Sequence, residues 1–95
     1  MFNINETSRG FSVCDFKDCN GVECSIQDSS VATEPMIWLG PTGPNPKVLV
    51  FNEGWVPAEI PDGIECTTRM HLSVDQCIDL VSILNRFIET GTIKE

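Results

Sequence analysis

Arg69 and His71 are the residues of this sequence whose types and spacing best suit binding chemistry. They alternate with Met70 and Leu72, and successive side chains of a strand point to opposite faces, so Arg69 and His71 share one polar face. A guanidinium beside an imidazole can hold an anion, such as the phosphate of a nucleotide or a carboxylate of a partner. The alternative is structural: Arg69 pairs with a neighbouring glutamate, and His71 hydrogen-bonds a loop carbonyl.

Residues suited to catalysis are scarce. His71 is the only histidine, and the Ser29-Ser30 pair lacks the Gly-x-Ser-x-Gly sequence of a nucleophile elbow. Asp75 and Asp79 lie one turn apart on the exposed side of a predicted helix, where open solvent makes them poor acid–base groups. We therefore expect a protein that is not an enzyme, with no catalytic residue and no cofactor.

Five cysteines are present, which is an odd number and fits a reducing compartment better than a disulfide framework. The even spacing of Cys14, Cys19 and Cys24 is the one feature that resembles a metal site. However, Cys14 and Cys24 fall on predicted strands, where free cysteine commonly serves as a small buried hydrophobe. The sequence therefore predicts no metal site.

The residues around Arg69 and His71 form a strand at 64–72 that runs directly into a helix at 74–90. Ser73 and Gln76 have the spacing of a capping box, and Gly91 stands where a helix ends. Apolar residues cover an arc of roughly 200° on this helix, wider than the stripe of a helix that lies on one sheet. The helix is therefore either cradled by a curved sheet or paired with a second copy, which would give a homodimer through the C-terminal helix.

The preceding chain is a series of short strands separated by turns. Asn20-Gly21 predicts a hairpin because both residues tolerate positive φ. Since all the helix comes last, the class is α+β, with an antiparallel sheet of four or five strands and one C-terminal helix packed across it. Residues 1–9 are predicted to be a flexible N-terminus, and residues 10–95 a single domain. The other predicted strands are 10–16, 21–27, 36–40 and 47–52.

The two tryptophans lie beside or within Gly/Pro-rich segments. Trp38 belongs to the strand at 36–40, which is apolar on both faces and suits a central strand or one that meets a partner. Trp55 falls in a predicted loop between Gly54 and Pro57. Such a tryptophan either covers the end of the core or anchors a partner, because aromatic residues are favoured interface anchors.

Fourteen acidic residues against six basic ones give a formal net charge of −8. This charge argues against direct nucleic-acid binding, which needs lysine and arginine to neutralise phosphates. It permits an acidic surface, including Asp75 and Asp79, that competes for a basic groove on another protein, or one that only keeps the chain soluble. No segment has the length of a membrane span, and residues 1–6 lack the apolar core of a signal peptide, so we expect no membrane association and a cytoplasmic location.

Three stretches carry a resemblance. Cys24-Ser25-Ile26-Gln27-Asp28-Ser29-Ser30-Val31-Ala32-Thr33-Glu34, Ile37-Trp38-Leu39-Gly40 and Thr68-Arg69-Met70-His71-Leu72-Ser73 resemble a pattern in small phage and prophage proteins of unknown function. The resemblance implies a phage-type accessory protein that acts in the host cytoplasm. It assigns no activity and no site.

Two functions follow as hypotheses. In the first, the protein binds and inhibits a host protein, such as a defence component, through Trp38, Trp55, Asp75 and Asp79. In the second, it sequesters a small nucleotide-type signal through Arg69, His71 and an aromatic side chain.

Overall fold

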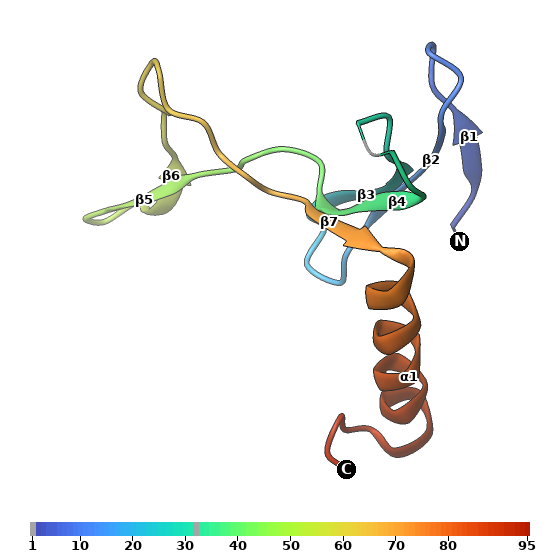
Figure 1. Cartoon of the computed structure of the whole chain (residues 1–95). Coiled ribbons are helices and arrows are strands. Elements are labelled where there is room, and N and C mark those ends of the chain that lie inside the picture. Colours follow the sequence, from blue (N-terminus) through green and yellow to red (C-terminus); the bar gives the residue numbers. More distant parts are fainter. Residues whose placement is uncertain (1, 32) are drawn as a thin grey trace.

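Five antiparallel strands form the main sheet of the molecule, and one helix, α1 (Val74–Thr90), follows the last of them (Figure 1). This computed structural model describes residues 2–31 and 33–95; Ala32, in the predicted turn before residue 36, lies outside the described residues. The predicted α+β class, antiparallel sheet and single C-terminal helix are confirmed. The spatial order of the strands is β1 (Ile4–Glu6), β2 (Ser12–Lys17), β3 (Glu23–Asp28), β4 (Met36–Pro41) and β7 (Met70–Ser73).

The β2–β3 hairpin forms at the predicted Asn20-Gly21 turn. Asp18 Oδ1 accepts hydrogen bonds from the backbone N–H of Asn20 at 2.8 Å and of Val22 at 2.9 Å. Gly21 has a φ of +83°, a conformation that a side chain would disfavour. An aspartate that bonds the backbone two residues on is a common turn device, so this local chemistry fixes the register of β2 on β3.

β1 is a strand that the sequence pattern did not predict, within the segment expected to be a flexible N-terminus. Its residues pair with β2 in the register Ile4 opposite Cys14. The ring of Phe2 also stacks on that of Phe16, with centroids 4.3 Å apart. Backbone pairing and one aromatic contact therefore join residues 2–6 to the sheet.

The predicted strand at 47–52 is present but lies outside the main sheet. Within the described residues, β5 (Lys47–Val50) pairs only with β6 (Gly54–Pro57), so Trp55 lies in a strand and not in the predicted loop. The turn between them is tight, with positive φ at Asn52 and Gly54. The three prolines at positions 41, 44 and 46 prevent a regular continuation of β4, and the local turn gives β5 a partner at once. The hairpin therefore projects to one side of the sheet (Figure 1).

The predicted strand at 64–72 is shortened to β7, Met70–Ser73, which pairs with β4. The alternation from Ile64 to Thr67 is present, yet these residues are assigned to no strand. A strand needs a neighbour for its backbone hydrogen bonds, and the segment that would have supplied one forms the separate hairpin. Residues 58–69 therefore form a long connection back to the sheet.

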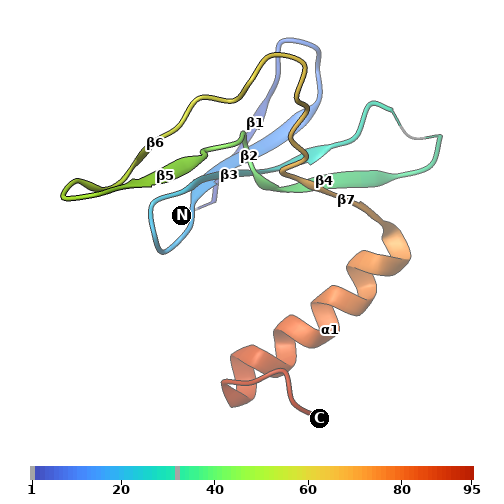
Figure 2. The same cartoon turned by 90° about the vertical axis from the view of Figure 1, so that its left-hand side faces the viewer.

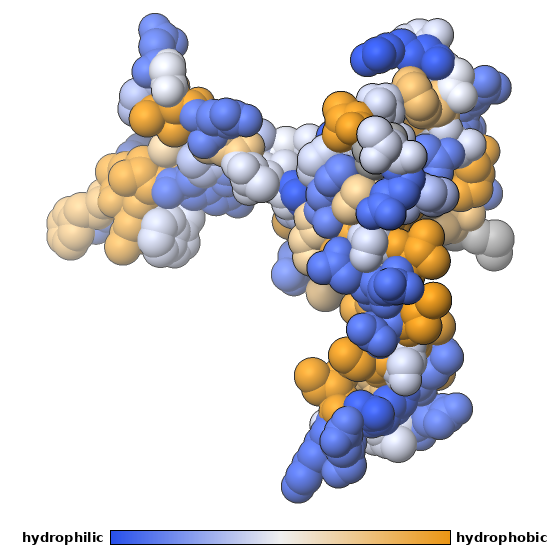
Figure 3. All heavy atoms as spheres, viewed as in Figure 1, coloured by the Kyte–Doolittle hydropathy of each residue, from blue (hydrophilic) through white to orange (hydrophobic). Residues whose placement is uncertain are grey.

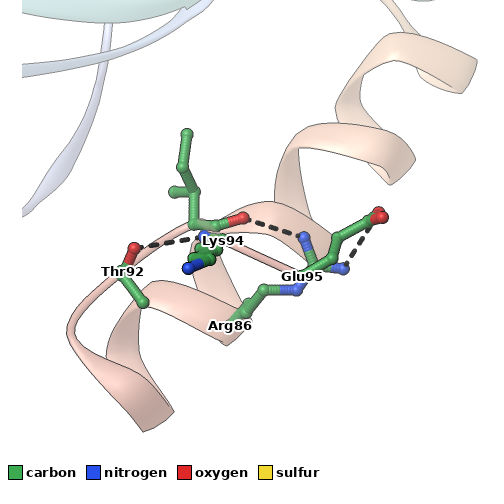
Figure 4. Close-up of polar contacts among 5 residues, drawn as sticks. Arg86, Thr92, Lys94 and Glu95 are labelled. Atoms are coloured by element: carbon green, nitrogen blue, oxygen red, sulfur yellow. Dashed lines mark hydrogen bonds and ion pairs between the residues drawn. The ribbon is translucent and has the colours of Figure 1, made fainter.

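The helix begins and ends at the predicted residues. Ser73 Oγ accepts from the N–H of Gln76 at 3.2 Å, and Gln76 Oε1 accepts from the N–H of Ser73 at 3.0 Å, which completes the capping box. Gly91 ends the helix with a φ of +81°. Beyond it, Arg86 binds the C-terminal tail through the carbonyl of Ile93 at 3.2 Å and the carboxylate of Glu95 at 3.9 Å (Figure 4).

The helix packs next to β7 and extends away from the sheet instead of lying across its face (Figure 2). No residue of α1, all of which the structure describes, is buried. The expectation of a cradling sheet is therefore wrong. The reason is the junction, because Ser73 is both the last residue of β7 and the helix cap and leaves no linker for a return. Among the described residues, those that are buried are Cys14, Cys24 and Ser25.

Ser73→Ala should lower the free energy of unfolding by about 0.5–2 kcal/mol, because it removes the side chain that accepts from the helix N-terminus. The matched control is Ser82→Ala, at an exposed position of the same helix. It should be neutral or slightly stabilising, since alanine has the higher helix propensity. Urea unfolding followed by circular dichroism measures both, and equal effects of the two changes would show that the capping box contributes nothing.

Candidate functional site

The register of three strands brings one row of polar and aromatic side chains together. Gln27 on β3 lies opposite Trp38 on β4, and Trp38 lies opposite His71 on β7. Directly paired residues of neighbouring strands project from the same face of a sheet. The opposite face carries an apolar row, in which Ile26 pairs with Leu39 and Leu39 with Met70. The two faces of the sheet therefore differ in chemistry.

Trp38 and His71 form a stacked pair on this face. Their ring centroids are 4.0 Å apart, and the ring planes are inclined by 15°. A hydrogen bond of 2.8 Å joins His71 Nε2 to Ser29 Oγ, just beyond the end of β3. Stacking fixes the plane of the imidazole and the hydrogen bond fixes its rotation, so His71 is held in place from two directions.

Arg69 is the cationic member of the cluster. Its Nη1 donates to Gln27 Oε1 at 3.1 Å, and its guanidinium carbon lies 5.4 Å from the centroid of the Trp38 ring, within the range of a cation–π contact. Gln27 takes one of the five N–H donors that a guanidinium carries. Among the described residues, no carboxylate forms an ion pair with Arg69, in contrast to the glutamate pairing that was one expectation. We call these five half-buried residues, whose rings and donors share one face, the polar platform: Gln27, Ser29, Trp38, Arg69 and His71.

Gly40 determines how closely Arg69 approaches β4. It has a φ of +144°, and a Cβ built on it would lie 2.9 Å from the carbonyl oxygen of Thr68 and 3.2 Å from the Cα of Arg69. Only glycine combines this backbone conformation with so close an approach. The segment before β7 therefore passes directly beside Gly40, and this contact places the Arg69 side chain over the ring of Trp38.

Ser25 lies on the same face of the sheet as Gln27, two residues earlier in β3. It pairs with Gly40 and is 2% exposed. Its hydroxyl oxygen makes no hydrogen bond to any of the described residues. A buried hydroxyl of this kind normally binds protein, water or ligand, so it is a further polar group beside the platform.

The polar platform contains some of the residues predicted from the sequence, and the others lie elsewhere. Arg69 and His71 come together as expected from their alternation, and the aromatic side chain that joins them is Trp38. Trp55 is 68% exposed on the β5–β6 hairpin, so it does not cover the core. Asp75 and Asp79 are exposed on the first turns of α1. The residues predicted for partner binding therefore lie on three separate elements.

Gln27 and Ser29 were not singled out from the sequence. Gln27 lies on the polar side of a predicted strand and Ser29 in a predicted polar turn, and neither position by itself indicates a site. Only the register of β3, β4 and β7 brings them to Arg69 and His71, and that register joins segments 42 residues apart.

The hydrogen bond between Ser29 and His71 also invites comparison with the nucleophile–base pair of a hydrolase. A triad needs a third group, usually a carboxylate, that orients the imidazole through its other nitrogen. Among the described residues, Ser29 is the only hydrogen-bond partner of the His71 imidazole. The described residues also include no group of three or more His, Cys, Asp or Glu side chains that could hold a metal ion. All five cysteines are free thiols, with Cys14 and Cys24 buried as predicted.

Comparison with protein-family models, with curated proteins and with solved structures finds no match to this chain. The site is therefore interpreted from its own geometry. Within residues 2–31 and 33–95, no helix is long and apolar enough to cross a membrane.

Gly40→Ala should destabilise the fold by about 1–3 kcal/mol, because the added methyl forces the backbone of Thr68 and Arg69 away and leaves alanine in a strained conformation. The matched control is Gly43→Ala, where a Cβ would meet nothing within 4 Å and φ is not positive. Thermal unfolding of both variants checks this prediction. Equal stability of the two would contradict the close approach of residues 68–69 to β4.

Proposed function

We propose that this protein is a non-enzymatic binding protein that captures a small anionic ligand of the nucleotide type on the polar platform. The observation that supports the proposal is the clustering of Arg69, His71 and Trp38 on one half-exposed face, where the arginine has no carboxylate partner among the described residues. Among the described residues, Arg86 is the one basic side chain with an ion pair, so the distinctive feature of Arg69 is its position over the Trp38 ring. Its remaining donors suit a phosphate.

Each member of the platform has a part in this proposal. The guanidinium of Arg69 binds a phosphate through charge-assisted hydrogen bonds, which are about twice as strong as neutral ones. The stacked rings of Trp38 and His71 offer a flat aromatic surface against which a base can pack. Ser29 and Gln27 add a hydroxyl and an amide that can bond a sugar or the edge of a base.

The overall negative charge favours a small ligand over a polyanion. A nucleic acid would meet the repulsion of the whole acidic surface, and its binding depends on neutralising many phosphates at once. A mononucleotide carries few charges and can be held by contacts of short range. Capture without turnover removes a ligand from solution in proportion to the amount of protein.

This behaviour suits an accessory protein that sequesters a host signal. The resemblance to small phage and prophage proteins supports that biological setting, and with it a location in the host cytoplasm. The proposal assigns no cofactor and no catalytic residue to the chain.

The direct test is calorimetric titration of the protein with AMP, ATP, cyclic AMP and inorganic phosphate, together with mass spectrometry of compounds released by heating protein that has been incubated in a cell lysate. Arg69→Gln should weaken binding of the captured nucleotide at least about tenfold, because a hydrogen bond to a charged group contributes about 1.5–3 kcal/mol.

The matched control is Arg86→Gln, which removes the same charge from α1, where the guanidinium forms a hydrogen bond and an ion pair with the C-terminal tail (Figure 4). It should bind as the unaltered protein does. Absence of any bound or released nucleotide, or equal binding by the two variants, would contradict the proposal.

A second function, the binding and inhibition of a host protein, is favoured by the β5–β6 hairpin. This hairpin exposes Phe51 by 90% and Leu49 by 63% in addition to Trp55. Large aromatic side chains presented in this way are typical interface anchors. Asp75 and Asp79, on a different element, would add an acidic contact to a basic partner.

Trp55→Ala separates the two functions. If a host protein is the target, this change should abolish its capture, because the largest side chain of the hairpin is lost, while the double change Arg69→Ala and His71→Ala should leave capture intact. Pull-down with purified variants, each shown to be folded by circular dichroism, measures both. Capture that survives Trp55→Ala but fails in the double variant would rule out the hairpin as the binding surface.

A further inference from the structure

The helix exposes a continuous apolar face, which we call the apolar helix face. Its side chains lie along the whole length of α1. Several are far more exposed than the side chains of a helix packed in a core, with Ile78 at 61% and Ile88 at 76%. Figure 3 shows hydrophobic side chains along the helix and on the hairpin. The apolar helix face consists of Val74, Ile78, Val81, Leu84, Phe87 and Ile88.

The chain cannot cover this face by itself in the observed fold. Ser73 ends β7 and caps α1, with both hydrogen bonds of the capping box formed, so the direction of the helix follows from the direction of the strand. Without a linker, the helix cannot turn back over its own sheet. The covering surface must come from another molecule.

The exposed area of the chain is larger than that of a compact monomer of the same mass. The solvent-accessible surface is 7855 Å², whereas a compact monomer of this mass exposes about 5,400 Å². The radius of gyration of 16.7 Å exceeds the roughly 12 Å of a compact domain of this length. The surplus is about 2,400 Å² per chain and includes the β5–β6 hairpin as well as the helix; each subunit of an obligate homodimer buries about 1,000–2,500 Å².

A groove at the start of the helix indicates how a covering molecule would fit. It has a volume of about 570 Å³ and lies between the first half of α1, the start of β4 and the end of β3. The second half of the helix, by contrast, presents the large side chains Leu84, Phe87 and Ile88. The apolar lining of the groove includes Met36, Ile37, Leu72, Val74, Ile78 and Val81.

We infer that the protein folds as a two-fold homodimer in which the second half of each α1 fills the groove beside the first half of the other. A two-fold interface requires that residue i contacts residue j and that j contacts i. Antiparallel helices meet this requirement, because each copy supplies one groove and one set of large side chains. The inference does not rest on the ligand proposed for the polar platform, although Ser29 of the platform also lines the groove.

A second copy suits this surface better than an unrelated partner. The buried residues within the described chain are two cysteines and a serine, so the missing core is needed whenever the chain is folded. Only another copy is present in equal amount from the moment of synthesis. A marginal core cannot wait for a partner, because the free energy of unfolding of a domain is small even with a complete core.

The distribution of charge permits this contact in spite of the net charge of −8. The groove includes one carboxylate, that of the exposed Asp28. The charged residues of the helix fall on the wedge opposite the apolar helix face, so the helix adds no charge to the contact. They are Asp75, Asp79, Arg86 and Glu89.

Sedimentation equilibrium and thermal unfolding over a hundredfold range of concentration test the inference. We expect twice the mass of one 10.5 kDa chain and a midpoint of unfolding that rises with protein concentration, as mass action requires of a dimer that dissociates on unfolding. A monomer that unfolds cooperatively at a midpoint independent of concentration would overturn the inference, and so would an odd-numbered assembly.

Leu84→Glu places a charge on the apolar helix face, and Ser82→Glu places the same charge on the polar wedge of the same helix. The first should shift the monomer–dimer equilibrium at least a hundredfold toward monomer or unfolded chain, and the second should leave the mass unchanged. A dimeric Leu84→Glu protein would overturn the inference.

A measurement of contacts between the two copies distinguishes an interface role of Leu84 from a role within one chain. In a mixture of isotope-labelled and unlabelled unaltered chains, filtered nuclear Overhauser effects should connect Ile78 of one copy with Leu84 or Phe87 of the other. Dimers whose only intermolecular effects arise from the hairpin would overturn the proposed use of the helix.

Discussion

The pairing of β4 with β7 brings together parts of the chain that are far apart in the sequence. About thirty residues separate these strands, and they include the whole β5–β6 hairpin. One register, with Trp38 opposite His71 and Ile37 opposite Leu72, sets three things at once. It assembles the polar platform, it fixes the strand from which α1 starts, and it brings the backbone of Arg69 against Gly40. A slip of β7 by a single residue would turn Arg69 and His71 to the apolar side of the sheet, away from Trp38.

The sheet in this protein is a single layer, and this explains the contrast between its two proposed surfaces. Most domains bury a sheet under a second layer of helix or sheet. Here the helix leaves the sheet at its end, so apolar side chains of both elements remain accessible. The polar platform can be exposed in a stable protein, because its side chains are bonded to one another. The apolar helix face has no such internal compensation, and burial is the stable arrangement for it.

Local signals predicted the features that depend on neighbouring residues. The bounds of α1 followed from Ser73, Gln76 and Gly91, and the β2–β3 hairpin from Asn20-Gly21. The alternation around Met70 placed Arg69 and His71 on one face. The departure of β5 from the sheet could not be predicted in this way, because it depends on which distant segment reaches β4 first. The same limit concealed Gln27 and Ser29, since nothing in the sequence near them indicates that β7 passes within hydrogen-bond distance.

The β5–β6 hairpin has a consequence for how this protein could diversify. Its backbone hydrogen bonds close within the hairpin itself, and at its base the N–H of Ala58 donates to the carbonyl of Pro46 at 3.0 Å. Residues between these two positions can therefore be lengthened, shortened or replaced without breaking a bond of the main sheet. This segment could therefore change in sequence and length while the polar platform and the helix stay as they are. Changes in sequence would then fall in the β5–β6 hairpin, and the main sheet and the helix would keep the fold.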